Sequence, residues 1–135
     1  MKLLGIDFGL SRIGIAVGTT ESGIAFPRQI LQRQGHFMEI IATLVKDEAI
    51  DAIVVGMPLK RDGSRGDIFA ELDDFVDELR ELTGKEVILY DERYTSKLAE
   101  HRLSKGGMKL KDQKDIADSI AAQIILQEWL DEQAV

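Results

Sequence analysis

Residues 5–9 have the sequence Gly-Ile-Asp-Phe-Gly, in which an aspartate stands inside an apolar segment between two glycines. Apolar and branched residues lie on both sides of it, and Gly-Leu-Ser-Arg occupies 9–12. Apolar runs bounded by Gly and Ser are typical of strands, so the sequence predicts a β-hairpin here. Aspartate is depleted in strands, and a buried carboxylate without a partner is costly. Asp7 therefore either faces solvent from a half-exposed strand or binds a cation.

The rest of the chain alternates between strand and helix patterns. Apolar residues at helical spacing predict amphipathic helices, whereas continuous apolar runs are typical of parallel strands buried on both faces. Pro27 indicates an edge or irregular strand, because proline cannot donate a hydrogen bond to a sheet. The predicted strands are 2–8, 12–19, 24–32, 50–56 and 87–90; the predicted helices are 35–48, 68–82, a short one from Thr95 or Ser96, and a last one capped by Asp112 after a basic loop at 104–111.

This order of elements predicts an α/β fold in a single domain over residues 1–135. A hairpin-led group of strands followed by strand–helix–strand units gives a mixed sheet with helices on its faces. We expect five strands, the first three antiparallel, with helices on both faces of the sheet.

Composition excludes several classes of site. The chain has no cysteine, which excludes disulfides, thiolate zinc sites and a thiol nucleophile. Its two histidines, His36 and His101, cannot build a histidine-rich metal site. No signal-peptide pattern and no membrane-length apolar run are present, so we expect a cytoplasmic protein without a membrane partner.

Charge is unevenly distributed along the chain. The formal net charge is −7, which argues mildly against a nucleic-acid partner. Residues 67–82 hold seven acids and one base, however, whereas residues 93–114 hold seven bases and two acids. The pattern is consistent with ordinary solvated surfaces, or with one face that meets phosphates and another that does not.

Familiar nucleotide and hydrolase motifs are missing. Gly9 and Gly14 have the spacing of a phosphate-binding loop, but Ile15 stands where that loop requires lysine. Gly-x-Gly-x-x-Gly, Gly-x-Ser-x-Gly and His-Glu-x-x-His do not occur. Nucleotide-dependent transfer, serine hydrolysis and zinc proteolysis are disfavoured.

Acids in apolar surroundings remain as the candidate site. Asp91 and Glu92 follow the run at 87–90, at the strand end where open α/β sheets bind ligands. Asp118 stands among Ile and Ala residues inside the last helix, a poor position for aspartate. If these acids and Asp7 share a pocket, a divalent cation would remove their repulsion. Hard oxygen ligands select Mg²⁺ or Mn²⁺, and such sites hydrolyse phosphodiesters.

Four blocks of sequence, in order, resemble the YqgF/RuvX family. They are Gly-Ile-Asp-Phe-Gly at 5–9 with Arg-Ile-Gly-Ile-Ala at 12–16; Val-Val-Gly-Met-Pro at 54–58 with Gly-Ser at 63–64; Asp-Glu-Arg-Tyr-Thr-Ser at 91–96; and Asp-Ser-Ile-Ala-Ala at 118–122 with Ile-Ile-Leu at 124–126. The resemblance covers essentially the whole chain.

This resemblance implies an RNase H-like fold and a nuclease that uses Mg²⁺ or Mn²⁺. It implies Asp7, Glu92 and Asp118 as metal-binding catalytic carboxylates, with Asp91 as a further candidate ligand. It implies a role in ribosome biogenesis, in processing the 5′ end of pre-16S rRNA. Resolution of four-way DNA junctions in recombination and repair is the alternative, because the family is also compared with the resolvase RuvC.

Basic residues near the proposed site are candidates for phosphate contact. They are Arg12, Lys60, Arg61, Arg65 and Arg93 in or beside the loops, and Lys105, Lys109 and Lys111 in the basic segment. The expected partners are structured RNA or branched DNA, and both a monomer and a homodimer remain open.

Two other function classes stay open at this point. A non-catalytic nucleic-acid binding module is disfavoured, because carboxylates that face phosphate would not help a binder. A phosphotransferase of the actin and sugar-kinase type also begins with an Asp-x-Gly strand, but those enzymes close two such domains around ATP and this chain has one.

Overall fold

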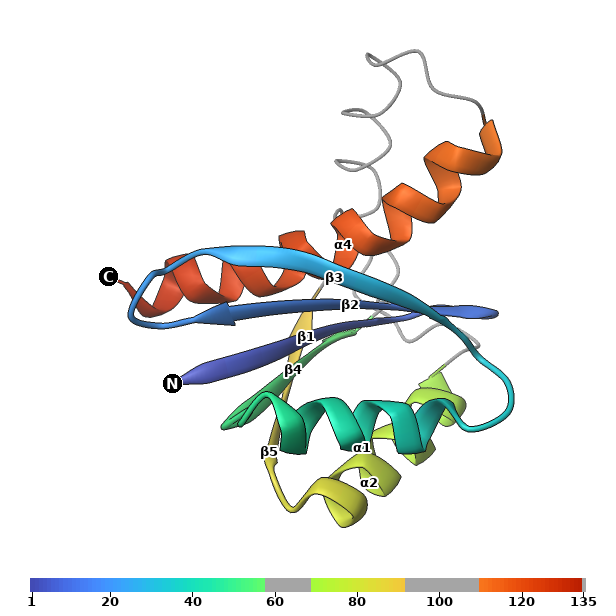
Figure 1. Cartoon of the computed structure of the whole chain (residues 1–135), viewed down its shortest axis with the longest axis horizontal. Helices are drawn as coiled ribbons and strands as arrows, with labels where there is room; N and C mark the ends of the chain where they lie inside the picture. The colour runs from blue at the N-terminus through green and yellow to red at the C-terminus, as the bar shows by residue number, and fades with distance from the viewer. Residues whose placement is uncertain (58–68, 92–109, 135) are drawn as a thin grey trace.

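The described part of the chain forms one five-stranded sheet flanked by helices (Figure 1). The computed structural model describes residues 1–57, 69–91 and 110–134, with the backbone alone for 110–119. In chain order the described elements are β1 (Lys2–Phe8), β2 (Arg12–Thr19), β3 (Ala25–Gln32), α1 (Phe37–Asp47), β4 (Ala52–Met57), α2 (Phe69–Thr83), β5 (Glu86–Asp91) and α4 (Leu110–Gln133).

The sheet has the order β3-β2-β1-β4-β5. Strand β2 pairs antiparallel with both β1 and β3, while β4 is parallel to β1 and β5. The prediction of a mixed sheet whose first three strands are antiparallel is therefore confirmed. Strand β3 is an edge strand, as Pro27 indicated, and its register with β2 shifts there: Ala16 pairs with Pro27 but Ile15 with Gln29, so Arg28 is the extra residue of a bulge.

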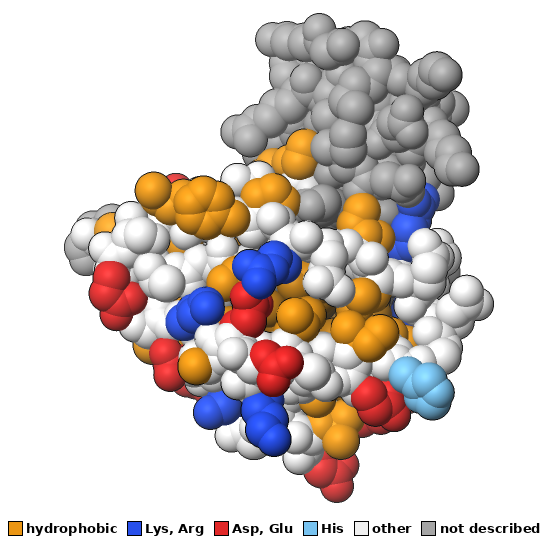
Figure 2. All heavy atoms as spheres, in the orientation of Figure 1, with side chains coloured by type: hydrophobic (Ala, Val, Ile, Leu, Met, Phe, Trp, Pro, Cys, Tyr) orange, Lys and Arg blue, Asp and Glu red, His pale blue; other side chains and the backbone are white. Residues whose placement is uncertain are grey.

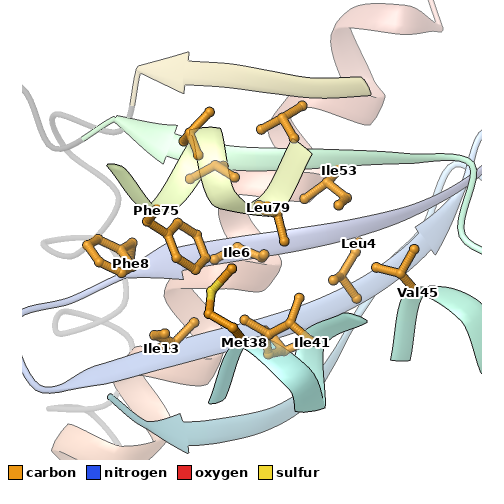
Figure 3. Close-up of a cluster of buried hydrophobic side chains, with 14 of the residues drawn as sticks. Leu4, Ile6, Phe8, Ile13, Met38, Ile41, Val45, Ile53, Phe75 and Leu79 are labelled. Atoms are coloured by element: carbon orange, nitrogen blue, oxygen red, sulfur yellow. The ribbon is translucent and has the colours of Figure 1, made fainter. Parts of the chain in front are cut away.

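Helices cover both faces of the sheet, as predicted (Figure 1). The larger apolar core lies between the sheet and helices α1 and α2, and large aliphatic and aromatic side chains fill it (Figure 3). Strand β1 contributes Leu4, Ile6 and Phe8 to this core. The second core, under α4, includes Leu3 of β1 and the small residues Ala16, Ala25 and Ala52. Alternate residues of β1 thus face opposite helices, as strand geometry requires.

Gly5 allows α4 to approach the sheet closely. A Cβ atom added at Gly5 would lie 2.8 Å from Cβ of Leu126 and 3.2 Å from the carbonyl oxygen of Ala122. Gly18, which pairs with Leu3, lies in the same way against a side-chain methyl of Leu130, at 3.0 Å. Later residues of α4 thus contact earlier positions of β1, so the helix runs antiparallel to the strand. Because Gly5 and Gly18 have no side chains, α4 packs closely at these two positions, and this fixes its position along β1.

Strand β5 corrects one expectation. The apolar run at 87–90 predicted a strand buried on both faces, but β5 is the edge strand and only Val87 is buried. Leu89 is 37% exposed. A central strand is covered by neighbours that the local sequence does not specify, so composition alone cannot separate it from an edge strand.

The start of α4 corrects another expectation. Asp112 was expected to cap this helix, but α4 begins at Leu110, so Asp112 lies within its first turn. Aspartate is favoured at the N-cap because its side chain accepts hydrogen bonds from free backbone amides, and in the first turn because of the helix dipole. An aspartate near a helix start therefore does not show from sequence alone which of the two positions it occupies. Leu110 and Lys111 are accordingly helical rather than part of a loop, while the expected short helix at Thr95 and the loop residues 104–109 lie outside the described residues. No helix in the described part of the chain is long and apolar enough to cross a membrane.

Candidate active site

Asp7 lies near the carboxyl end of β1, on the face covered by α4. It pairs with Gly14 of β2 and is half-buried. Its chain neighbours Ile6 and Phe8 both belong to the core on the opposite face. Because side chains alternate along a strand, Asp7 shares its face with Leu3 and Gly5, the positions that pack against α4.

Asp91 lies at the same edge of the sheet as Asp7. It is the last residue of β5, is half-buried, and pairs with Met57 at the end of β4. Strands β1, β4 and β5 are parallel, so their carboxyl ends share one edge, where open α/β sheets bind ligands. With strands about 4.8 Å apart, β1 and β5 are separated by about 10 Å across β4.

The remaining predicted carboxylates are described less completely. Glu92 follows β5 outside the described residues, and Asp118 lies in α4 in the part described by its backbone alone. Within the described side chains, no three His, Asp or Glu residues form a group that could hold a metal ion. The described part of the chain thus brings two of the four predicted ligands, Asp7 and Asp91, to one edge of the sheet. Val87 packs in the α1/α2 core, whereas Ile88 and Tyr90 pack against the α4 core, so alternation along β5 places Asp91 on the face opposite Asp7.

Of the predicted phosphate contacts, Arg12 is described in full. It is half-buried at the start of β2, and its carbonyl oxygen accepts a hydrogen bond of 2.9 Å from the amide of Gly9. This bond closes the turn that follows Asp7. Lys111 lies in the part of α4 described by its backbone. The other candidates lie outside the described residues: Lys60, Arg61, Arg65, Arg93, Lys105 and Lys109.

Arg33, which the sequence reasoning missed, holds the same turn. Its Nη1 donates to the carbonyl oxygens of Gly9 and Leu10, at 3.2 and 3.0 Å, and its Nη2 pairs with Glu71 of α2 at 2.7 Å. Its guanidinium lies 4.3 Å from the ring centroid of Phe8. These partners lie far from Arg33 in sequence, so no local pattern marks it.

Acidic side chains surround Arg33 on the α2 side. A hollow of about 210 Å³ beside it is lined by three acids of α2, Glu71, Asp74 and Glu78, together with Phe8. All the described acids of α2 are exposed, as its helical pattern predicted. Lys and Arg side chains are interspersed with Asp and Glu on the face shown in Figure 2. Clustered acids repel phosphate, so the acid-lined hollow beside Arg33 disfavours a nucleic acid.

A family model described as "RuvX: Holliday junction resolvase" matches residues 1–132. The chain belongs to the RuvX family. The resemblance in its four sequence blocks is thereby confirmed.

Bacterial relatives match over nearly the whole chain. One from Halalkalibacterium halodurans is 37% identical over 137 residues, covering 98% of each chain. Another from Pseudomonas savastanoi pv. phaseolicola is 38% identical over 133 residues, covering 96% of this chain and 91% of the relative. Both are named "Putative pre-16S rRNA nuclease".

Solved structures confirm the fold. Thermus thermophilus RuvC in complex with a Holliday junction substrate is similar with a TM-score of 0.59, over 99% of this chain and 96% of RuvC, at 16% identity. The RuvX chain therefore has the RNase H-like fold that its sequence blocks implied.

Proposed function

We propose that this RuvX chain is a metal-dependent endonuclease that cleaves structured nucleic acid, and that its substrate is the 5′ end of pre-16S rRNA. The observation that carries the proposal is Asp7, a half-buried carboxylate at the carboxyl end of a central strand, facing the helix that contains Asp118. The names of its relatives point to the same chemistry and supply the RNA substrate.

The residues present fit a hard divalent cation. Asp7 provides a carboxylate at the sheet edge on the α4 face, and Asp7, Glu92 and Asp118 would hold Mg²⁺ or Mn²⁺ through oxygen ligands. Asp91 ends β5 on the opposite face, so it is the least well placed of the four predicted ligands. Such an ion, when bound, activates water and stabilises the charge that develops on the phosphate. The chain itself orients the carboxylates and keeps them at the strand edge.

The packing of α4 supports a place for Asp118 in this set. Ala122 and Leu126 pack against Gly5, and Asp118 precedes Ala122 by four residues, so it belongs to the same row of the helix. Four helix residues rise about 6 Å, and two strand residues, from Gly5 to Asp7, rise about 6.6 Å. Because the helix and strand are antiparallel, the turn with Asp118 extrapolates to the level of Asp7.

The distribution of charge supports an approach from the α4 side. Asp7 lies on that face, whereas the exposed acids of α2 lie on the opposite one. The basic segment 93–114 precedes and enters α4. We propose that this segment, with Arg12 and the basic residues of 60–65, binds the phosphates.

A cleavage panel tests the catalytic proposal. Structured RNA containing the 5′ end of pre-16S rRNA, and four-way DNA junctions, would be incubated with the protein and Mg²⁺ or Mn²⁺. Asp7→Asn should remove cleavage by orders of magnitude while leaving the fold intact, because one metal ligand is lost. Asp51→Asn is the matched control: Asp51 precedes β4 at the opposite end of the sheet, where it accepts a hydrogen bond from the amide of Lys2. If Asp7→Asn cleaves at the wild-type rate, the proposed site is wrong.

The same cleavage panel also distinguishes between RNA and four-way DNA as the substrate. The family description names a Holliday junction resolvase, which favours four-way DNA as the second candidate substrate. Cleavage of the junction but not the RNA would select that alternative. Tight binding of either without cleavage by wild-type protein would select a non-catalytic binding module, and ATP binding would select a phosphotransferase.

The salt dependence of binding tests the proposed contact surface. Replacing Lys105, Lys109 and Lys111 by Ala should weaken binding to all sequences and flatten the log–log salt slope by up to about one unit per lost phosphate contact. Replacement of Lys46 and Lys85, two exposed lysines near the opposite end of the sheet, is the control. An unchanged slope would assign the contact to the 60–65 segment instead.

We further propose that residues 1–135 act as one nuclease domain in the cytoplasm, as a monomer or a homodimer. One sheet runs through all the described strands, and the family model spans residues 1–132. Light scattering with and without the RNA would distinguish the two oligomeric states.

A further inference from the structure

Arg33 makes contacts that converge on the turn directly after Asp7. The Gly9–Arg12 turn has three carbonyl oxygens that accept hydrogen bonds from Arg33: those of Gly9 and Leu10 from Nη1, and that of Ser11 from its backbone amide at 2.9 Å. The side chain of Arg33 is 16% exposed, so these bonds are partly shielded from water.

Apolar packing and the internal hydrogen bond restrain the turn unequally. The side chain of Leu10 is 80% exposed, so apolar packing does not fix the tip. Within the turn, Gly9 donates to the carbonyl of Arg12, and a Cβ atom at Gly9 would lie 2.7 Å from that oxygen. The turn is therefore tight, and the carbonyls of Gly9, Leu10 and Ser11 within it accept hydrogen bonds from Arg33.

The aromatic contacts extend this restraint to the strand. The guanidinium of Arg33 covers one side of Phe8, and the ring of Phe75 stacks on Phe8 at 4.4 Å between centroids. Phe8 follows Asp7, and its side chain points to the opposite face. A fixed Phe8 ring on one face thus fixes the backbone from which Asp7 projects on the other.

We propose that Arg33 is a positioning residue for cleavage: it holds the Gly9–Arg12 turn and the end of β1, and thereby sets the direction of the Asp7 carboxylate. This inference rests on the proposed nuclease function. It gives Arg33 no contact with the substrate.

The surroundings of Arg33 separate this role from phosphate binding. Its charge is paired with Glu71, and Asp74 and Glu78 line the same hollow. Phosphates are repelled by such a cluster of acids. Removal of Arg33 should therefore change the rate of cleavage and leave the salt slope of binding unchanged.

Arg28 provides a matched control on the same strand. It also pairs with a glutamate, Glu48, whose side chain is 15% exposed, but it lies at the bulge of β3 and, among the described residues, forms no hydrogen bond or ion pair with the turn. Arg28→Gln leaves a partly buried carboxylate unpaired, so it should lower the melting temperature. It should not change the rate constant of the folded enzyme.

The experiment compares kcat, KM and backbone amide exchange, below the melting temperature of every variant, for Arg33→Gln, Arg33→Lys, Glu71→Gln and Arg28→Gln. Arg33→Gln should lower kcat by about 10- to 100-fold, since small displacements of a catalytic group have effects of that size, with KM within about threefold. Arg33→Lys should recover only part of this loss, because an ammonium lacks the planar fork of donors. Glu71→Gln should have the smallest effect of the three, because the bonds to the turn carbonyls persist.

Amide exchange tests the restraint without any cleavage. Exchange at Gly9 and at position 33 should accelerate in Arg33→Gln and stay at the wild-type rate in Arg28→Gln. Wild-type exchange in the turn of Arg33→Gln, or wild-type kcat in that variant, would overturn the inference. Failure of the wild-type protein to cleave any substrate would instead overturn the proposed function, and the exchange data would still test whether Arg33 orders the turn.

Discussion

The two faces of the sheet are built from different residues. Against α1 and α2, strand β1 presents Leu4, Ile6 and Phe8, and the core there is made of large side chains (Figure 3). Against α4 it presents Leu3, Gly5 and Asp7, opposite a core with several alanines. One strand thus supplies apolar volume to one face, and close helix approach and a carboxylate to the other.

The two faces therefore contribute differently to stability and to the candidate site. Burial of large apolar side chains supplies most of the stabilisation of a domain, and the α1/α2 face holds most of them. The α4 face has small residues, which allow the helix to pack closely against the strand that contains Asp7. Mutations on the two faces should therefore separate stability from cleavage.

Asp118→Asn should have the largest effect on cleavage, with an increase in metal-free stability. If Asp118 shares a pocket with Asp7 and Glu92, the metal-free protein holds like charges together. Two carboxylates about 4 Å apart repel by roughly 4 kcal/mol at an effective dielectric of about 20, before relaxation or proton uptake reduces it. The variant should lose cleavage, melt at a higher temperature in EDTA, and gain less stability from Mg²⁺ or Mn²⁺ than the wild type.

Thermal melting at neutral pH, with EDTA and with metal, checks this prediction. A structural aspartate paired with a base or an amide would give the opposite sign, a lower melting temperature in EDTA. A variant that is destabilised in EDTA and still gains the wild-type increment from metal removes Asp118 from the site, and Asp115 or Asp112 would be tested next.

Leu79→Ala should have the largest effect on stability alone. Leu79 is fully buried in the α1/α2 core, and such truncations cost about 2–5 kcal/mol. Urea unfolding measures the loss, and kcat below the melting temperature should stay within about twofold of the wild type, since no site residue moves. Leu82→Ala on the same helix is the control, because Leu82 is 52% exposed. A large fall in kcat for folded Leu79→Ala would show that the two faces are coupled.

The fold could be predicted from the sequence to a large extent, because it depends on local patterns. The hairpin follows from apolar runs around a Gly-Leu-Ser-Arg turn, and the edge position of β3 from Pro27. The edge position of β5 could not be predicted from residues 86–91. It depends on the order of the strands in the sheet, in which β4 is the neighbour of β5 on one side and no described strand pairs on the other.

The candidate site likewise contains residues that local sequence marks and one that it does not. Asp7 was found because aspartate is unusual in a strand, and Asp91 because it ends an apolar run. Arg33 was missed because its partners, the carbonyls of Gly9 and Leu10 and the carboxylate of Glu71, are brought to it by tertiary structure. A surface arginine after a strand has no local feature that distinguishes it. The metal-binding roles of Asp7, Asp91, Glu92 and Asp118 all stay predictions.

Gly5→Ala should affect both stability and cleavage, because Gly5 packs against α4 on the face of β1 that also holds Asp7. Its new Cβ would approach Cβ of Leu126 to 2.8 Å, an atom that no rotamer change can move. Helix α4 must therefore shift, at a cost of about 1–3 kcal/mol, and kcat should fall because the helix contains Asp118.

Gly23→Ala is the control for Gly5→Ala. Gly23 has a φ of +68°, and an added Cβ would meet no atom within 4 Å. It should lose about 1 kcal/mol from backbone strain and keep the wild-type kcat. Equal kcat in the two variants would show that close packing of α4 on β1 is not needed for cleavage.

Glu128→Gln should have the smallest effect. It tests whether an acid near the carboxyl end of α4 is destabilised by burial and by neighbouring negative charge, as we propose for the acids of the site. Burial raises the pKa of Glu128, and the charge of neighbouring Glu132 adds to the rise. Tyr90 donates a hydrogen bond of 2.8 Å to Glu132. A carboxyl whose pKa is higher in the folded state destabilises the fold once it is ionised. Removing the charge should therefore raise stability at pH 7, by a few tenths of a kcal/mol after solvent screening.

The pH dependence gives the sign of this effect. The raised pKa means that the native state holds the proton of Glu128 more tightly than the unfolded chain does. The advantage of Glu128→Gln should thus be full above the folded pKa and disappear as the pH falls below the ordinary pKa of glutamate, where both proteins are neutral at this position. Glu21→Gln is a control of opposite sign, because the N-terminal ammonium lowers the pKa of Glu21; that variant should melt slightly lower at pH 7. Urea unfolding between pH 4 and pH 8 measures both, and a Glu128→Gln protein that is less stable at pH 7 would show that the carboxylate forms a favourable contact, so that charge strain on α4 would be confined to Asp118.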